Sequence, residues 1–218
     1  MKSKKIGLIA VCAVLVLAAS VFGTIAYLTD TTETVQNTFT IGTLLDDSDE
    51  FVLKEHEATD ADNDGVYTLS ETSEVDGNTY TVLPGVDLPK DPFVKTTGAL
   101  EMDAYVFVEV VDETGTALSF TVDNTNWTEL TDVTGPNGGT VYRLAANDGI
   151  AEAGSALGPV SILAKNTNGK EITVANEAIS DADAQFGGDV TFYGYMIQAG
   201  GFDSASAAWT AGFAGSDD

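Results

Sequence analysis

Histidine, cysteine and basic residues are scarce in this sequence. Its 218 residues include one histidine, one cysteine and nine Lys+Arg, against 34 Asp+Glu. A zinc protease site of the HExxH type needs two histidines one helical turn apart, so the lone His56 cannot build it. His56 would also have to serve any Ser–His or Cys–His pair, and no carboxylate pair stands out among so many acids. We therefore expect no catalytic residues and no enzyme.

The excess of acid gives a formal charge of −25. Nucleic acid is excluded as a partner, because a phosphate backbone requires a basic patch. Lys2, Lys4 and Lys5 precede the first apolar run, so the chain without residues 1–26 has six bases against 34 acids. An anionic membrane surface is therefore a poor partner once those residues are removed. Such acidity suits a secreted protein that self-repulsion keeps soluble, or one that collects cations.

An apolar run, Ile6–Phe22, follows the first lysines. The small residues Thr24 and Ala26 come next, in the spacing that a signal peptidase accepts before a new terminus at Tyr27. We expect residues 1–26 to be a signal peptide, with an uncleaved membrane anchor as the alternative. Cys12 lies inside this leader, where it is an inert residue rather than a lipidation site, so the mature chain would have no disulfide.

The new amino terminus, residues 27–44, has the pattern of a half-apolar strand. Val35, Phe39 and Ile41 fall on one side of a period-two alternation, and polar residues fall on the other. Such a segment can pair with the edge of a sheet. The sequence leaves open whether that sheet belongs to a neighbouring subunit or to the same chain.

This region also carries a resemblance to a known family. Thr24–Asp30 (TIAYLTD) followed by Asn37–Leu44 (NTFTIGTL) resembles the exported proteins cut by the SipW-type signal peptidase of Gram-positive bacteria, the TasA/camelysin family. Three later stretches fit the same pattern: Leu83–Gly85 running into Lys90–Val94, Thr97-Gly98 leading to Ala104–Val106, and Gly194–Ala199 before Trp209. Camelysins are classed as metalloproteases, but a single histidine does not support carrying that activity over.

The resemblance implies a subunit of an extracellular or biofilm matrix fibre, located in the matrix or at the cell surface. Its partners would be further copies of itself and accessory matrix proteins. We expect polymerisation by donor-strand exchange, with residues 27–44 completing a sheet of the next subunit. The alternatives are a monomeric calcium-binding surface adhesin or surface-layer protein, and a hydrolase.

Residues 45–218 predict an all-β domain, an antiparallel two-sheet sandwich that is jelly-roll-like and has one or two short helices. The clearest strand is Met102–Val111, with Ala104, Val106, Val108 and Val110 facing the core. The other expected strands are Phe51–Glu57, Val66–Leu69, Thr79–Leu83, Ser119–Val122, Trp127–Val133, Thr140–Leu144, Val160–Leu163, Ile172–Val174 and Val190–Gln198.

Three of these expectations concern position. Val190–Gln198 is apolar on both faces, which is typical of a strand in the middle of a sandwich. Asp203 is expected to cap a short helix over Ser204–Ala211, and Asn176–Ala184 to form a second helix or a loop. Four aromatic residues suggest either sugar-binding platforms or packing, and we expect packing: Trp127, Trp209, Tyr193 and Tyr195.

The most specific local motif runs from Asp60 to Glu71, DADNDGVYTLSE. Asp60, Asp62 and Asp64 occupy positions one, three and five of a calcium loop, the Val66 carbonyl position seven, and Glu71 position twelve. Hard oxygens at this spacing converge on one Ca²⁺. The flanking segments are strand-like rather than helical, so a solvated hairpin turn is the alternative.

Overall fold

The computed structural model describes residues 43–115, 118–175 and 189–213, which belong to one compact unit. The signal peptide with Thr24, Ala26 and Tyr27, and the strand residues Val35, Phe39 and Ile41, lie outside the described residues. So does the segment expected over Asn176–Ala184. Among the described residues, no helix has the length and apolar content needed to cross a membrane.

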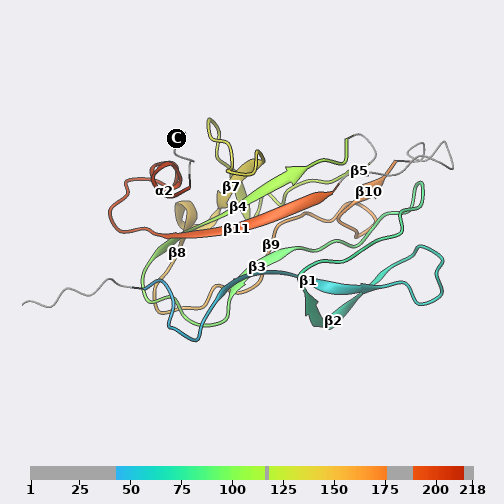
Figure 1. The fold of residues 1–218 in the computed structure, drawn as a ribbon, viewed down its shortest axis with the longest axis horizontal. Helices are drawn as coiled ribbons and strands as arrows, with labels where there is room; N and C mark the ends of the chain where they lie inside the picture. Colours follow the sequence, from blue (N-terminus) through green and yellow to red (C-terminus); the bar gives the residue numbers. More distant parts are fainter. Residues whose placement is uncertain (1–42, 116–117, 176–188, 214–218) are drawn as a thin grey trace, which may run out of the picture. The chain divides into compact units, whose positions relative to one another are not determined.

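The described chain is an all-β structure of antiparallel sheets, as the sequence predicts (Figure 1). A four-stranded sheet has the order β2-β1-β3-β9, a five-stranded sheet the order β11-β4-β7-β6 with β8 also on β4, and β10 pairs with β5. The strands are β1 (Phe51–Thr59), β2 (Thr68–Val75), β3 (Phe93–Thr96), β4 (Ala104–Asp112), β5 (Leu118–Ser119), β6 (Trp127–Glu129), β7 (Thr140–Leu144), β8 (Ile150–Ala151), β9 (Val160–Ser161), β10 (Thr173–Val174) and β11 (Val190–Gln198).

Strand β4 packs on both of its faces. Val106 and Val108 belong to the main core, which also contains Val94 of β3 in the opposite sheet. Tyr105 and Phe107 belong to a second core, whose buried centre is Trp209. The sequence predicted that the face with Val106 and Val108 is buried, and it made no prediction for the face with Tyr105 and Phe107. The five-stranded sheet is therefore covered on one side by the other sheet and on the other side by a helix.

That helix is α2 (Ala205–Gly212), and a short 3-10 helix, η1 (Ala146–Gly149), precedes β8. The expected cap Asp203 is wrong by one residue. The side chain of Ser204 accepts a hydrogen bond from the backbone N–H of Ala207, with Ser204 in an extended conformation, so Ser204 is the N-cap. This start places Trp209 against the sheet, with its ring centroid 5.2 Å from that of Phe107.

The predicted strand Thr79–Leu83 does not form. β1 pairs with β2 through its second half and with β3 through its first half, and no strand follows β2 until β3. Instead, the side chain of Asn78 fills the irregularity between His56 and Ala58 in β1. It accepts from the Ala58 N–H at 2.8 Å and donates to the His56 carbonyl at 2.8 Å. A side-chain amide here replaces the pairing that a backbone would supply.

One charged side chain lies in the fully buried part of β4. Glu109 is 0% exposed. Its Oε1 accepts from the backbone N–H groups of Asn137 and Gly139, both at 2.9 Å, and its Oε2 accepts from the Asn137 side chain at 3.0 Å and the Tyr195 hydroxyl at 2.7 Å. Burial by itself raises the pKa of Glu109, but the hydrogen bonds from Asn137, Tyr195 and Gly139 outweigh it and lower the pKa below 4.5.

Replacing Glu109 by Gln tests this interaction. We expect the free energy of unfolding at pH 7 to fall by about 2–3 kcal/mol, because charge-assisted hydrogen bonds are lost and amide hydrogens face other donors. Because the folded pKa is lowered, the carboxylate stabilises the fold above pH 4.5 and loses this effect as the pH falls below it. The difference from wild type should therefore shrink on acidification.

Urea denaturation of both proteins at several pH values measures this difference. Glu113→Gln is the matched control, since Glu113 is exposed, and it should change stability by less than about 0.5 kcal/mol. Equal stability of Glu109→Gln and wild type at pH 7 would contradict the assignment.

Candidate functional site

The acidic motif forms the loop of the β1–β2 hairpin. The ladder ends at the pair Thr59–Thr68, and the loop between them brings Asp60, Asp62 and Asp64 together, with one carboxylate oxygen from each within 4.8 Å of the others. No other group of this kind occurs among the described residues. Three of the four carboxylates that the sequence predicts to converge therefore do so.

Hydrogen bonds hold this loop in shape. The Asp60 carboxylate accepts from the backbone N–H of Asp64 at 3.1 Å and of Gly65 at 2.9 Å, and Asp64 accepts from the Val66 N–H at 2.9 Å. Gly65 has a φ of +79°, and a Cβ there would lie 2.2 Å from the side chain of Leu83. A glycine is therefore required at the sixth position for both its conformation and its space.

Glu71 is not part of the cluster. β2 begins at Thr68, so Glu71 lies on an exposed position of the strand rather than closing the loop. Strands rise by about 3.3 Å per residue, which carries Glu71 away from the loop. The structure thus has a hairpin turn, the alternative named above, with three of the predicted carboxylates gathered in it, and calcium binding stays a prediction.

The second candidate is the edge strand β11. It has the predicted bounds, and it is the terminal strand in the order β11-β4-β7-β6. Both of its apolar faces are covered. Phe192 and Met196 pack on the main core, and Tyr195 and Ile197 pack on the core under α2. A strand covered by a sheet on one face and a helix on the other is apolar on both faces even at an edge.

The ladder shows which backbone groups of β11 face its outer edge. At its two ends, Glu113 N–H donates to the Asp189 carbonyl at 3.0 Å and Ala199 N–H donates to the Asp103 carbonyl at 2.8 Å. Hydrogen-bonded pairs alternate along an antiparallel ladder, so odd-numbered residues of β11 bond to β4. The even-numbered residues direct their N–H and C=O groups to the edge, where no described strand pairs with them: Val190, Phe192, Gly194, Met196 and Gln198.

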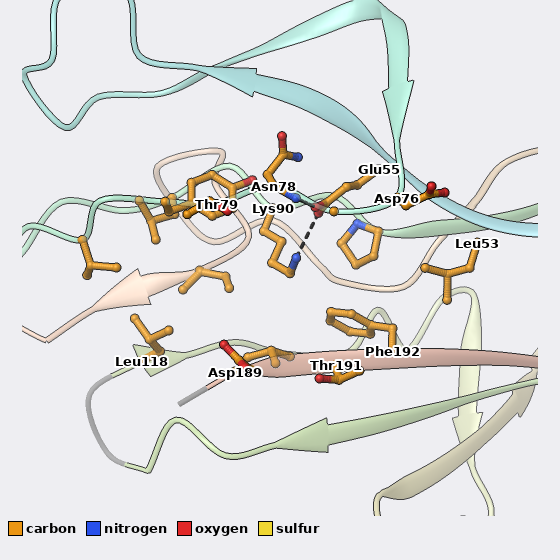
Figure 2. Close-up of a pocket in the computed structure, with 17 residues that line it drawn as sticks. Leu53, Glu55, Asp76, Asn78, Thr79, Lys90, Leu118, Asp189, Thr191 and Phe192 are labelled. Carbon is orange, nitrogen blue, oxygen red and sulfur yellow. Dashed lines mark hydrogen bonds and ion pairs between the residues drawn. The ribbon is translucent and has the colours of Figure 1, made fainter. Parts of the chain in front are cut away.

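A pocket of about 620 Å³ lies beside the start of β11, between the two sheets. Figure 2 shows Leu53 and Glu55 of β1 on one side and Phe192 of β11 on the other, with Lys90 reaching in from the segment before β3. The wall is mixed. Polar groups of Glu55, Asn78, Lys90 and Asp189 lie beside apolar and aromatic side chains: Leu53, Tyr80, Val82, Leu88, Pro92, Leu118, Ile172, Val190 and Phe192.

An ion pair lies inside this pocket. Lys90 Nζ is 3.0 Å from Glu55 Oε2, and the two side chains are 15% and 4% exposed. The other Glu55 oxygen accepts from the backbone N–H of Asn78. Lys90 Nζ also lies 5.7 Å from the ring centroid of Phe192. Nearby, burial and the charges of Glu55 and Asp91 raise the pKa of Tyr80, whose hydroxyl donates to the Pro89 carbonyl at 2.8 Å.

Of the remaining candidates, His56, Trp127, Trp209 and Tyr195 pack or pair within the fold, whereas Tyr193 is exposed. His56 Nδ1 lies 2.7 Å from Asp91 Oδ2, and its ring packs on Phe93. Trp127 and Trp209 are 1% and 0% exposed, which confirms packing rather than sugar binding for both. Of the two tyrosines, Tyr195 bonds to Glu109, and Tyr193 is 37% exposed.

A third buried carboxylate, besides Glu109 and Glu55, is Glu171, which has few partners among the described residues. It is 3% exposed, its Oε2 has no hydrogen bond, and Lys165 Nζ is 3.8 Å from its Oε1. Burial raises its pKa. Neither Glu171 nor the Glu55–Lys90 pair could be located from sequence, because their partners are 6 and 35 positions away with no shared motif.

The comparisons with known proteins give no match: no family model, no curated protein and no solved structure is similar to this chain. The resemblance to the TasA/camelysin family stays a hypothesis based on the quoted residues.

The hairpin loop allows a direct test of calcium binding. We expect Ca²⁺ to bind with a dissociation constant in the millimolar range, about that of weak extracellular sites. Asp62→Asn should weaken binding, because Asp62 belongs to the cluster. Glu71→Gln should leave it unchanged, because Glu71 lies outside it. Isothermal titration calorimetry measures the Ca²⁺ affinity of wild type and of both variants. Equal losses of affinity in Asp62→Asn and Glu71→Gln would contradict this geometry.

Proposed function

We propose that this protein is a secreted, non-enzymatic structural subunit that polymerises into extracellular fibres. In this proposal, residues 27–44 of one copy add as a strand to the outer edge of β11 in the next copy. The observation that carries the proposal is the position of β11: nine residues long, apolar on both faces, and last in its sheet. Long edges of this kind are templates for strand addition.

The chemistry of the two partners is complementary. An added strand would pair with the N–H and C=O groups of Val190, Phe192, Gly194, Met196 and Gln198. β11 spans about 30 Å, whereas 18 extended residues span about 60 Å, so the segment is long enough to pair and to bridge two subunits. Alternating Val35, Phe39 and Ile41 would extend one of the apolar faces of β11.

Charge sets the conditions for assembly. Subunits with six bases against 34 acids repel one another, and salt or divalent cations screen this repulsion. A calcium site in the β1–β2 loop would lower the charge further. The same loop favours the second candidate function, a monomeric calcium-binding adhesin or surface-layer protein at the cell surface.

Deleting residues 27–41 tests donor-strand exchange. We expect the variant to lose fibres in electron micrographs and to elute as a monomer, because the donor strand is gone. A synthetic peptide of residues 27–44 should cap the β11 edge and inhibit polymerisation of the intact protein. The control peptide with Phe39→Asp should inhibit much less, since a charge would face an apolar surface. Fibres of normal yield from the deletion variant would refute the proposal.

A substitution on the acceptor edge tests the same contact from the other side. Gln198→Pro removes an N–H that faces outward, so it should reduce fibre formation without disturbing the β11–β4 ladder. Gln198→Ala keeps this N–H and should polymerise normally. Circular dichroism of both variants checks that the monomer is folded.

The dependence on ionic conditions is a separate prediction. Fibre yield at low salt should rise when NaCl or CaCl₂ is added. A chelator should reverse the increase caused by CaCl₂ but not the increase caused by NaCl. Sedimentation of polymer across both titrations measures this. A yield that stays constant across both would contradict a role for charge screening.

A further inference from the structure

The pocket between the two sheets is an opening in the main core. Leu53, Tyr80, Val82 and Phe192 pack against this core but are only partly buried, and all four line the pocket. Its volume of about 620 Å³ falls within the range of small-molecule sites, about 300–1,000 Å³. Its lining combines apolar side chains with polar groups, so it suits a molecule that has both an apolar and a polar part.

One polar group in the pocket has unused hydrogen-bonding capacity. The Lys90 ammonium has three N–H donors, and its one hydrogen bond among the described residues goes to Glu55. Both Glu55 oxygens already accept hydrogen bonds, from Lys90 and from Asn78. The close-up shows the Lys90 amine between the Glu55 side and the Phe192 side of the pocket (Figure 2). The pocket therefore offers a hydrogen-bond donor close to the apolar side chains of Leu53 and Phe192.

The charges of the pocket determine which head group this donor suits. Glu55 neutralises Lys90, and Lys54 pairs with Asp76 at the pocket wall. Asp189 adds a further negative charge to the lining. Asp189 and Glu55 would repel a ligand with an anionic head group. The Lys90 ammonium would repel a ligand with a cationic head group. An uncharged oxygen acceptor meets neither repulsion.

We propose that this pocket binds an uncharged amphipathic molecule. Its apolar body lies between Leu53 and Phe192, and a carbonyl or hydroxyl oxygen accepts a hydrogen bond from Lys90. The pocket shares Val190 and Phe192 with the outer edge of β11, but all its lining residues belong to one subunit, so the site does not depend on polymerisation.

The test uses protein collected from the medium of a host that expresses the full chain. N-phenyl-1-naphthylamine, a neutral fluorescent probe, should bind saturably, and octanamide should displace it. Octanoate and octylamine have alkyl chains of similar length with charged head groups. Each should need a concentration about tenfold higher than octanamide, or more, to displace the probe. No saturable probe binding, or equal competition by the three heads, would overturn the proposal.

Two variants locate the site. Val82→Trp fills the pocket and should weaken octanamide binding about tenfold or more, whereas Val133→Trp, near the α2 core, should not. The double variant Glu55→Gln/Lys90→Met removes both charges together, so no buried charge is left unpaired. This variant should bind octanamide several-fold more weakly. It should bind the probe as well as wild type does, because the probe has no oxygen acceptor. Unchanged octanamide binding in Val82→Trp or in the double variant would overturn the assignment.

Discussion

The buried carboxylate of Glu109 is the constraint on which the five-stranded sheet depends. A fully buried charge is tolerable only when its oxygens are hydrogen-bonded, and here the donors come from two other parts of the chain. The turn before β7 supplies three of them and β11 supplies the fourth. The carboxylate therefore ties β4, β7 and β11 together at one level of the sheet. Glycine at 135 and 139 follows from this, because a Cβ would lie 2.0 Å from Glu109 Cδ or 2.5 Å from the Val110 carbonyl oxygen.

This constraint also explains why an apolar strand can stand at an edge. β11 pairs with β4 over nine residues, and the Tyr195 hydroxyl fixes its register at Glu109. α2 then covers the outer face of the same pair through Trp209. The strand is therefore held by its pairing with β4, by the Glu109 hydrogen bond, by the main core on one face and by α2 on the other. An added strand could use its outer edge without competing with any of these contacts.

The sequence predicted the parts of this fold that local pattern determines. The all-β class, the bounds of Val190–Gln198 and the convergence of Asp60, Asp62 and Asp64 follow from alternation and spacing. What it missed is non-local. The partners of Glu109 are 28 to 86 positions away, and the place of β11 depends on α2, which follows it. Thr79–Leu83 has strand composition, but the Asn78 side chain already pairs with the β1 backbone.

The two tryptophans lie in different interfaces of the described structure. The Trp127 indole N–H on β6 donates to the Ser161 carbonyl on β9 at 2.8 Å, so this ring joins the two sheets directly. Trp209 joins the helix to the five-stranded sheet, and its indole nitrogen has no hydrogen-bond partner among the described residues. The chain thus contains two intrinsic fluorophores, one that reports on sheet separation and one on helix undocking. Emission from single-tryptophan forms would distinguish which layer opens first when a subunit unfolds.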